Sequence, residues 1–396
     1  MRTQEDDDDG PNDNLRRNSP PSPLITPRVI RLFVVTAGAT VSFYTPLSAL
    51  PSLVQDQTGS STAAGATTAV LMLTTVVTEL FSVPLMRRWP AERLLFVGVA
   101  LLGLPALALT VLPPSLNLVL AVSALRGIGF ALSVVVGGAL AARSFPGGRK
   151  GEGMGVYGVV VGVFSITALP IGLMIGQNWG YAAVSAITAG SAIAVLPAAS
   201  RLHRTRPQTD VAPSRGDGRW TVSLVPAIGF LGTTIAAGVI ITFLPITFSA
   251  LGHASTVAIA CQSVASTSAR WLAGRLGDRR SHRELLAPGI GVAAIGVAAL
   301  VVADTGLGVT AAMIVFGIGF GVTMNASLAV MLESVPPSHY GGVSAQWNLA
   351  YDIGLGIGSI GFGMMLNLLP HRASYALVAG VVAVPLMLVT PRARRR

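Results

Sequence analysis

Apolar runs, each about 20 residues long and separated by short polar turns, follow one another along most of the chain. A helix of that length crosses a hydrocarbon core of about 30 Å, since each residue adds about 1.5 Å. The pattern therefore predicts membrane-spanning helices. We place twelve of them, near residues 29–51, 63–85, 94–112, 118–142, 153–176, 181–200, 222–248, 254–274, 285–303, 306–332, 341–368 and 373–391.

One long polar segment, 201–221, divides these runs into two sets of six. The two sets share sequence. The tetrapeptide GIGF at 127–130 recurs at 317–320, and ERLL at 92–95 has its counterpart RELL at 283–286, at offsets of 190 and 191 residues. Two matches at nearly one offset indicate a duplicated bundle, the usual organisation of secondary transporters. We expect an all-α polytopic membrane protein whose twelve transmembrane helices form two pseudo-symmetric six-helix bundles.

The composition agrees with this expectation. The chain has 396 residues, of which 52% are hydrophobic and only 11% charged, and its mean hydropathy is +0.66. An ordinary soluble protein carries about a quarter charged residues, so that class is excluded. The formal charge of +10 does not indicate nucleic acid as a partner, because the basic residues lie in short loops between apolar spans. A single cysteine, Cys261, excludes a disulfide within the chain.

Basic residues gather in alternate connections. They occupy the N-terminal segment, the turns after the second, fourth, sixth and eighth spans, and the C-terminal end, whereas the opposite loops hold only Arg372. This asymmetry predicts that both termini are cytoplasmic in the cell membrane. The expected organisation is a disordered cytoplasmic tail, an N-terminal bundle, a central cytoplasmic loop, a C-terminal bundle and a basic tail, at residues 1–28, 29–200, 201–221, 222–391 and 392–396.

Four ionisable residues lie well inside the spans: Glu79, Arg126, Arg270 and Asp352. A charge at the centre of a membrane helix costs about 2.5 to 3.5 kcal/mol, so such residues seldom face lipid. Asp352 is near mid-membrane on a polar helical stripe with Ser344 and Asn348, which suits a carboxylate that exchanges protons. A hydrogen-bonded structural aspartate is the alternative.

The other three ionisable residues each keep two interpretations. Glu79 lies near the cytoplasmic end of its span, where it either couples protons or pairs with arginines such as Arg87. Arg126 serves either substrate and proton coupling or a structural pairing. For Arg270, one turn from the predicted end of its span, we favour a side chain that extends toward the cytosol.

A segment after the eighth predicted span carries a recognisable motif. Gly274-Arg275-Leu276-Gly277-Asp278-Arg279-Arg280 resembles the cytoplasmic loop motif of the major facilitator superfamily, and the resemblance extends over about residues 29–391. It implies that Gly274, Asp278 and Arg279 control the conformational change, with the aspartate facing the positive end of a neighbouring helix. At the corresponding place in the first half, an arginine replaces the aspartate.

Two further motifs bear on coupling and direction. Residues 125–129, LRGIG, resemble the fourth-span motif in which an intramembrane arginine is linked to proton coupling. The fifth-span motif of drug/proton antiporters is only partly present, since Pro170 and Gly172 stand in place but Leu169 replaces a glycine. Gly354, Gly356 and Gly358 look like a dinucleotide fingerprint, yet inside an apolar span helix packing is the better account, as it is for Gly158 and Gly162.

The resemblance implies that spans 1, 4, 7 and 10 line a central cavity, which would place on its wall Phe43, Tyr44, Phe130, Phe243, Phe316, Phe320 and Asn325. Such walls suit a small, moderately hydrophobic molecule. We expect a secondary transporter that works by alternating access, with proton-coupled efflux as the first choice. Uptake of a small metabolite and a non-transporting membrane sensor are the alternatives. Its expected partners are the substrate, the lipid bilayer and protons. The residues expected to serve proton coupling are Asp352, Glu79 and Arg126. No enzyme chemistry, cofactor or metal site is expected.

Overall fold

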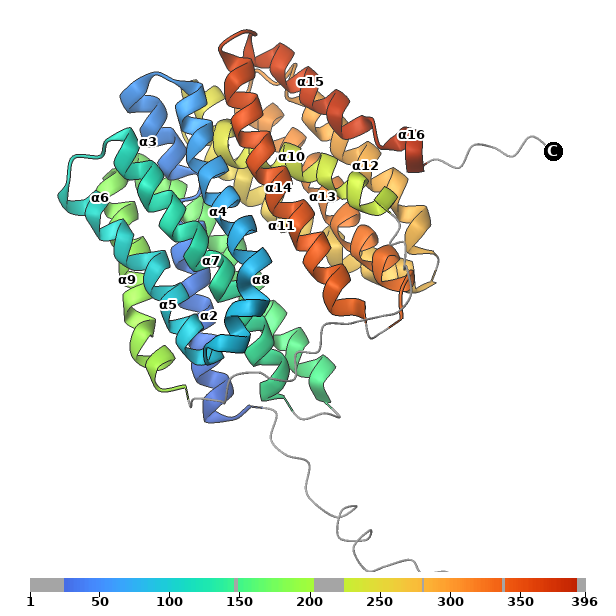
Figure 1. Cartoon of the computed structure of the whole chain (residues 1–396). Helices are drawn as coiled ribbons and strands as arrows, with labels where there is room; N and C mark the ends of the chain where they lie inside the picture. The colour runs from blue at the N-terminus through green and yellow to red at the C-terminus, as the bar shows by residue number, and fades with distance from the viewer. Residues whose placement is uncertain (1–24, 146–148, 203–223, 280, 337–338, 390–396) are drawn as a thin grey trace, which may run out of the picture.

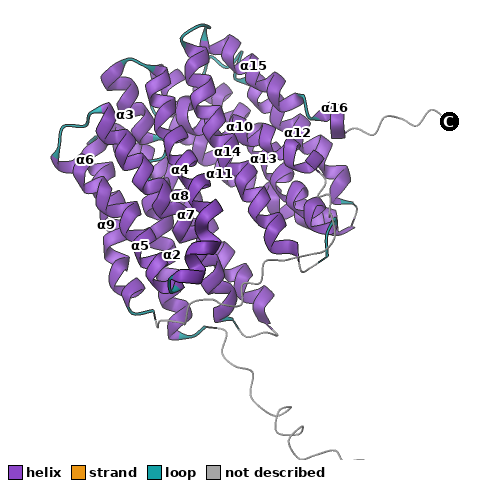
Figure 2. Cartoon of the chain, viewed as in Figure 1, coloured by secondary structure: helices purple, strands orange, loops and turns teal. Residues whose placement is uncertain are grey.

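The computed structural model describes residues 25–145, 149–202, 224–279, 281–336 and 339–389, and in these ranges every regular element is a helix (Figure 2). The first half comprises α2 (Pro27–Tyr44), α3 (Ala49–Thr58), α4 (Ser61–Arg88), α5 (Ala91–Gly103), the 3-10 turn η1 (Leu104–Leu107), α6 (Ala108–Val111), α7 (Leu116–Ser144), α8 (Lys150–Trp179) and α9 (Tyr181–Ser200). The second half comprises α10 (Leu224–Thr247), η3 (Ser249–Leu251), α11 (Ala254–Arg279), α12 (His282–Ala299), α13 (Gly306–Glu333), α14 (Tyr340–Leu366), α15 (His371–Ala383) and α16 (Leu386–Val389).

Each predicted span coincides with a helix or with consecutive helices, and ten such segments in the described ranges are long and apolar enough to cross a membrane. The two that fall short are α11 and α12. In α12 a polar first turn takes part of an 18-residue helix. In α11 the deficit comes from a polar face that includes Gln262, Ser266 and Arg270. Most of the predicted central loop and tails lie outside the described residues.

Helix ends are fixed by local side chains, because backbone groups in a bilayer must find partners within the protein. Ser60, Ser115 and Thr305 each accept a hydrogen bond from the backbone N–H three residues later and so begin α4, α7 and α13. The connection before α4 turns at Gly59, whose φ of 65° is in the left-handed region that glycine adopts without strain. These caps and the turn at Gly59 keep the connections before α4, α7 and α13 short.

The two halves share one packing scheme. Gly127 of α7 approaches the carbonyl of Leu71 in α4 so closely that a Cβ would not fit, and Gly317 of α13 approaches the carbonyl of Gln262 in α11 in the same way. Leu71 and Gln262 are 191 positions apart, while the glycines are 190 apart. Gly129 and Gly319 likewise meet α5 and α12. The sequence repeat is therefore a repeat of helix contacts.

The halves lie side by side and diverge toward one end, as the blue-to-green and yellow-to-red helices of Figure 1 show. All hydrogen bonds between halves that join described residues lie at the other end. There the Asn367 amide donates to the Thr62 hydroxyl at 2.7 Å, and the Thr68 and Thr242 hydroxyls are 3.1 Å apart. The Thr256 hydroxyl donates to the Gln177 side-chain oxygen at 3.0 Å. We call this the closed end, and the end where α2 begins and α9 ends the open end.

Candidate functional site

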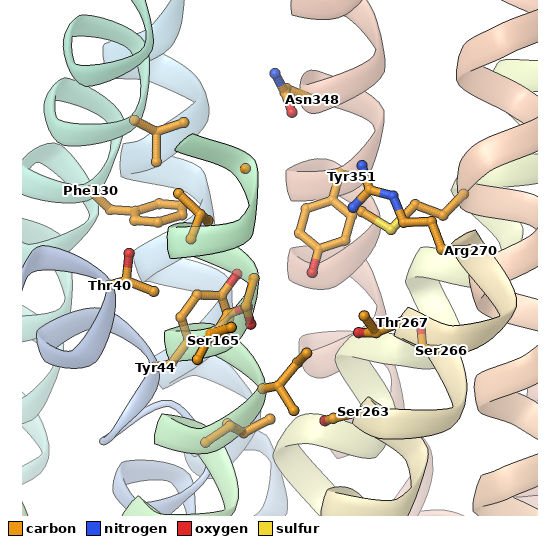
Figure 3. A pocket seen from close by; sticks show the side chains of 18 of the residues that line it. Thr40, Tyr44, Phe130, Ser165, Ser263, Ser266, Thr267, Arg270, Asn348 and Tyr351 are labelled. Carbon is orange, nitrogen blue, oxygen red and sulfur yellow. The ribbon is translucent and has the colours of Figure 1, made fainter. Parts of the chain in front are cut away.

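A cavity of about 750 Å³ lies between the two halves, and its wall is formed by α2, α4, α5, α7 and α8 on one side and by α10, α11, α13 and α14 on the other. Figure 3 shows side chains of both halves facing each other across it, with Tyr44 and Phe130 on one side and Arg270 and Tyr351 on the other. The volume falls within the range of sites for small organic molecules, roughly 300 to 1,000 Å³. The interhalf hydrogen bonds described above join the halves at the closed end.

Four of the predicted cavity residues line this wall: Tyr44, Phe130, Phe316 and Phe320. Phe130 stacks on Phe43 with ring centroids 3.5 Å apart, so the aromatic wall has a second layer behind it. Phe316 and Phe320, one helical turn apart on α13, stack at 5.6 Å. The wall is therefore a rigid apolar surface.

The other three predicted cavity residues lie elsewhere, and the expectation was wrong for them. Phe43 is only 2% exposed beneath Phe130, and Phe243 is fully buried against Phe362 of α14, with ring centroids 5.2 Å apart. Asn325 lies beside Gly274 of α11, where its Oδ1 is buried without a hydrogen bond to any described residue. Each belongs to a helix expected at the cavity, but the rotation of that helix points the residue into a helix interface.

Two carboxylates reach the cavity from opposite halves, Glu79 on α4 and Asp352 on α14. Two ionised carboxylates that share one cavity repel each other. Asp352 is only 3% exposed, because α14 packs tightly on both flanking helices: Gly356 lies against Met72 of α4 and Gly354 against Thr234 of α10. Asn348, one turn before Asp352, also lines the cavity. Glu79 thus joins Asp352 in one site.

Arg126 does not line the cavity. Its guanidinium is fully buried and donates hydrogen bonds to the carbonyls of Leu102, Ser42 and Phe43 at 3.2, 2.8 and 3.2 Å. Ser42 and Phe43 belong to the last turn of α2, whose carbonyls have no partner further along the helix. An arginine side chain satisfies such groups well. Of the two interpretations in the sequence, the geometry favours the structural one.

Arg270 is the charged cavity residue that the sequence analysis had directed toward the cytosol instead. It lines the cavity from α11 together with Ser263, Ser266 and Thr267, a spacing that places all four on one helical face. The predicted span ended at 274, but α11 continues to Arg279, which leaves Arg270 more than two turns inside. Its exposed surface therefore faces the cavity and not the solution beyond the helix end. The polar periodicity of α11 was the available signal.

The predicted conformational motif forms the last turns of α11 and is not a loop, which corrects the expectation. Gly274 faces Asn325 of α13, and Arg279 is exposed. The side chain of Asp278 lies outside the described part of the structure. Helix α11 includes residues 274–279 of the motif. The Ser281 hydroxyl accepts a hydrogen bond from the Arg283 N–H at 3.3 Å and begins α12.

The glycines of two helices differ in what they face. Gly354 and Gly358 of α14 pack against α10, as expected from helix packing. Gly158 and Gly162 of α8 line the cavity instead, and a Cβ at either would meet nothing within 4 Å. The packing expectation was therefore wrong for α8 in this conformation. Among the described residues no cluster of three or more histidine, cysteine or acidic side chains offers a metal site.

The sequence of the chain matches the model of the Major Facilitator Superfamily over residues 32–359. The match covers most of the chain, so this protein belongs to that family of secondary transporters. No curated protein matches the chain in sequence.

Solved structures show the same fold at low identity. The chain is similar to a D-xylose-proton symporter (TM-score 0.75, 14% identity, covering 93% of this chain and 99% of that one). It is also similar to a mutant of the nucleoside transporter NupG (TM-score 0.72, 12% identity, 91% and 98% covered). A mutant of the peptide transporter POT in complex with alafosfalin gives a TM-score of 0.73 at 12% identity, with 91% and 93% covered. At such identities the likeness establishes the fold alone.

Proposed function

We propose that this transporter moves a small, moderately hydrophobic molecule across the cytoplasmic membrane by alternating access, driven by protons. The observation that carries the proposal is a single cavity, between halves that hydrogen-bond to each other only at one end of the described structure, holding two carboxylates on an aromatic wall. The apolar wall suits the body of the substrate. The carboxylates supply groups that take up and release protons.

Asp352 is the proposed proton carrier, and Glu79 its partner. Asp352 is the more shielded of the two, lies near mid-membrane and has Asn348 beside it in either protonation state. The two charges repel, so protonation of one eases ionisation of the other. Arg126, which was expected to assist, supports α2 from behind the wall and contributes to coupling only through that helix.

The open end is proposed to face the cytoplasm. Apart from Arg126 and Arg270, every described arginine but one lies toward that end, and the exception, Arg372, pairs with Asp304 at the closed end. Residues 1–28, 201–221 and 392–396 would then be cytoplasmic, linking and flanking bundles at 29–200 and 222–391. Reporters fused after Thr58 and after Arg396 test this: they should lie on opposite sides of the membrane.

Efflux is the proposed direction for an uncharged or cationic hydrophobic substrate, because such a molecule enters an apolar cavity readily from the cytoplasm and competes there with protons. Uptake is the second candidate, and one observation favours it: Arg270 places a positive charge in the cavity that a cationic or uncharged drug does not need.

The test is transport by the full chain in proteoliposomes of either orientation, with and without an imposed pH gradient, and with a pH-sensitive dye inside. We expect substrate to accumulate against its gradient only when a pH gradient is present. Accumulation that ignores the pH gradient would show that protons are not the coupling ion.

A further inference from the structure

The charged side chains of the cavity differ in how much of each a ligand meets. Asp352 is almost completely covered, Glu79 is half-buried and Arg270 is exposed. An arginine keeps its charge under all ordinary conditions, whereas a carboxylate loses its charge by taking up a proton. The permanent and accessible charge of the cavity is therefore positive.

Within the described part of the chain, no side chain or carbonyl pairs with the charge of Arg270. Its guanidinium makes no hydrogen bond or ion pair with any described residue, whereas the equally intramembrane Arg126 donates to three carbonyls. Five N–H donors without protein acceptors are costly in a cavity with apolar walls. Such a group is satisfied by water when the cavity is empty and by an anion when it is occupied.

The surroundings of Arg270 match an amphipathic anion. Hydroxyl groups of Ser266 and Thr267 lie on the same helical face, and the phenols of Tyr44 and Tyr351, from the two opposite halves, line the same cavity (Figure 3). Tyr351 continues an aromatic surface with Trp347, at a centroid distance of 6.4 Å, toward Phe316 and Phe320 on the same wall. Donors for an acid group thus adjoin a surface for an apolar body.

We propose that the substrate is an organic anion with one acid group, a carboxylate in the simplest case, held by Arg270 with its apolar body against the aromatic wall of α13 and α14. The proposal deepens the proton-driven transport proposed above, in its uptake form, and rests on it. Arg270 forms two parallel hydrogen bonds to such a group, which a lysine or a neutral donor does not reproduce.

The cavity charges also set the coupling. With Glu79 and Asp352 both ionised, the charged side chains at the site sum to a net negative charge and repel an anion, and each proton taken up removes part of that repulsion. Bound anion and bound protons therefore favour each other, and the linkage is reciprocal. An anion would move with protons in one direction, which is the uptake candidate, whereas a cation would compete with them.

The test uses three probes with one body and different end groups: phenylbutyrate, phenylbutyramide and phenylbutylamine. The full chain in lipid nanodiscs is titrated with each by calorimetry, at two pH values at which the acid probe stays ionised. We expect the acid to bind about tenfold more tightly than the amide, and more tightly at the lower pH.

Variants assign the preference to one side chain. Arg270→Gln should weaken binding of the acid by about tenfold to a hundredfold, the worth of a charged hydrogen-bonded pair, and leave the amide nearly unchanged. Unchanged amide binding shows that the variant is folded. Arg270→Lys should retain part of the preference. Arg275→Gln is the matched control, because Arg275 is on the same helix but stacks on Trp271 at 3.9 Å, away from the cavity wall.

Tighter binding of the amine, no binding of the acid, or an acid preference that survives Arg270→Gln would each overturn the proposal. Failure of the transport function gives a different result. Arg270-dependent binding of the acid without acid-driven proton movement in proteoliposomes would leave the anion site standing and refute the carrier.

Discussion

The two halves of the molecule share their scaffold and differ in their chemistry. Gly127 and Gly317 make equivalent close contacts, α4 with α7 and α11 with α13. With the same offset of 191 that relates Leu71 to Gln262, Glu79 of α4 corresponds to Arg270 of α11, and both line the cavity. Equivalent positions thus carry opposite charges. The packing glycines and one aromatic cavity residue, Phe130 with its counterpart Phe320, recur in both halves, whereas the charged cavity position differs.

The same offset of 191 relates the end of α4 to the end of α11. Asp278 of α11 corresponds to Arg87 of α4, and Gly274 corresponds to Val83. Only the second half therefore carries the motif that resembles the family's conformational switch. We propose that the charges at the end of α4 follow the membrane topology alone, and that those at the end of α11 also serve the conformational change.

The largest effect on transport is expected from substitutions of the two cavity carboxylates. Asp352→Asn mimics the protonated acid, so it should abolish transport driven by a pH gradient while substrate still binds. Glu79→Gln should lower the rate and keep some coupling, because Asp352 remains. Proteoliposome transport with a pH-sensitive dye measures both. Normal proton coupling in Asp352→Asn together with its loss in Glu79→Gln would show that Glu79, in the first half, is the coupling acid.

The next effect concerns the cavity face of α8. Gly158→Trp fills space that is free in this conformation, and we expect this face of α8 to approach α11 when the open end closes. An overpacking penalty of about 1 to 3 kcal/mol in the closed state should slow transport by about fivefold to 150-fold.

Gly190→Trp is the matched control for that variant, since Gly190 lies exposed on α9 with nothing within 4 Å of an added Cβ. Transport assays on both variants, at equal amounts of folded protein, make the comparison. Full activity of Gly158→Trp would show that α8 and α11 do not approach each other there.

A smaller effect is expected at the helix ends. A carboxylate near a helix N-terminus is worth about 0.3 to 1 kcal/mol, so Asp278→Asn should change the ratio of the two conformations by about two- to fivefold. Arg87→Gln, at the corresponding position, should change that ratio less. Spin-label distance distributions between the open ends of α7 and α13, after replacement of Cys261, report the ratio. Equal ratios in Asp278→Asn and the parent protein would reduce the motif to a topology signal.

The smallest effect on transport is expected from the paired glycines, whose role is stability. Gly127→Ala and Gly317→Ala each force a Cβ against a carbonyl of the neighbouring helix and should each lower the free energy of unfolding by about 1 to 3 kcal/mol. Gly138→Ala on α7 is the control, because its Cβ would meet nothing within 4 Å. Thermal unfolding in detergent measures the three. A loss of stability at only one of the two glycines would show that the two helix contacts are not equivalent.

Much of the fold could be predicted because each spanning helix leaves its own signal. The spans, their repeat at 190 residues and the arginine asymmetry are properties of short segments, and α13 and α14 begin within a residue of the predicted positions. The site was predicted only in part. Four of seven wall residues and both acids line the cavity, whereas Phe43, Phe243 and Asn325 do not.

Two arginines separate what the sequence determines from what only the tertiary structure decides. By itself the sequence determined that Arg126 and Arg270 lie within spans, because the bilayer requires each helix to satisfy its own backbone and to be long and apolar enough to cross. Which of them faces the cavity depends on the rotation of each helix about its axis, and that rotation is fixed by contacts with neighbours distant in sequence. The contacts of α7 with α2 and α5 turn Arg126 toward the carbonyls at the end of α2. Gly317 and Gly321 of α13 pack against the backbone of α11 at Gln262, Ser266 and Arg270, and this contact fixes the rotation at which the side chains of that polar face line the cavity.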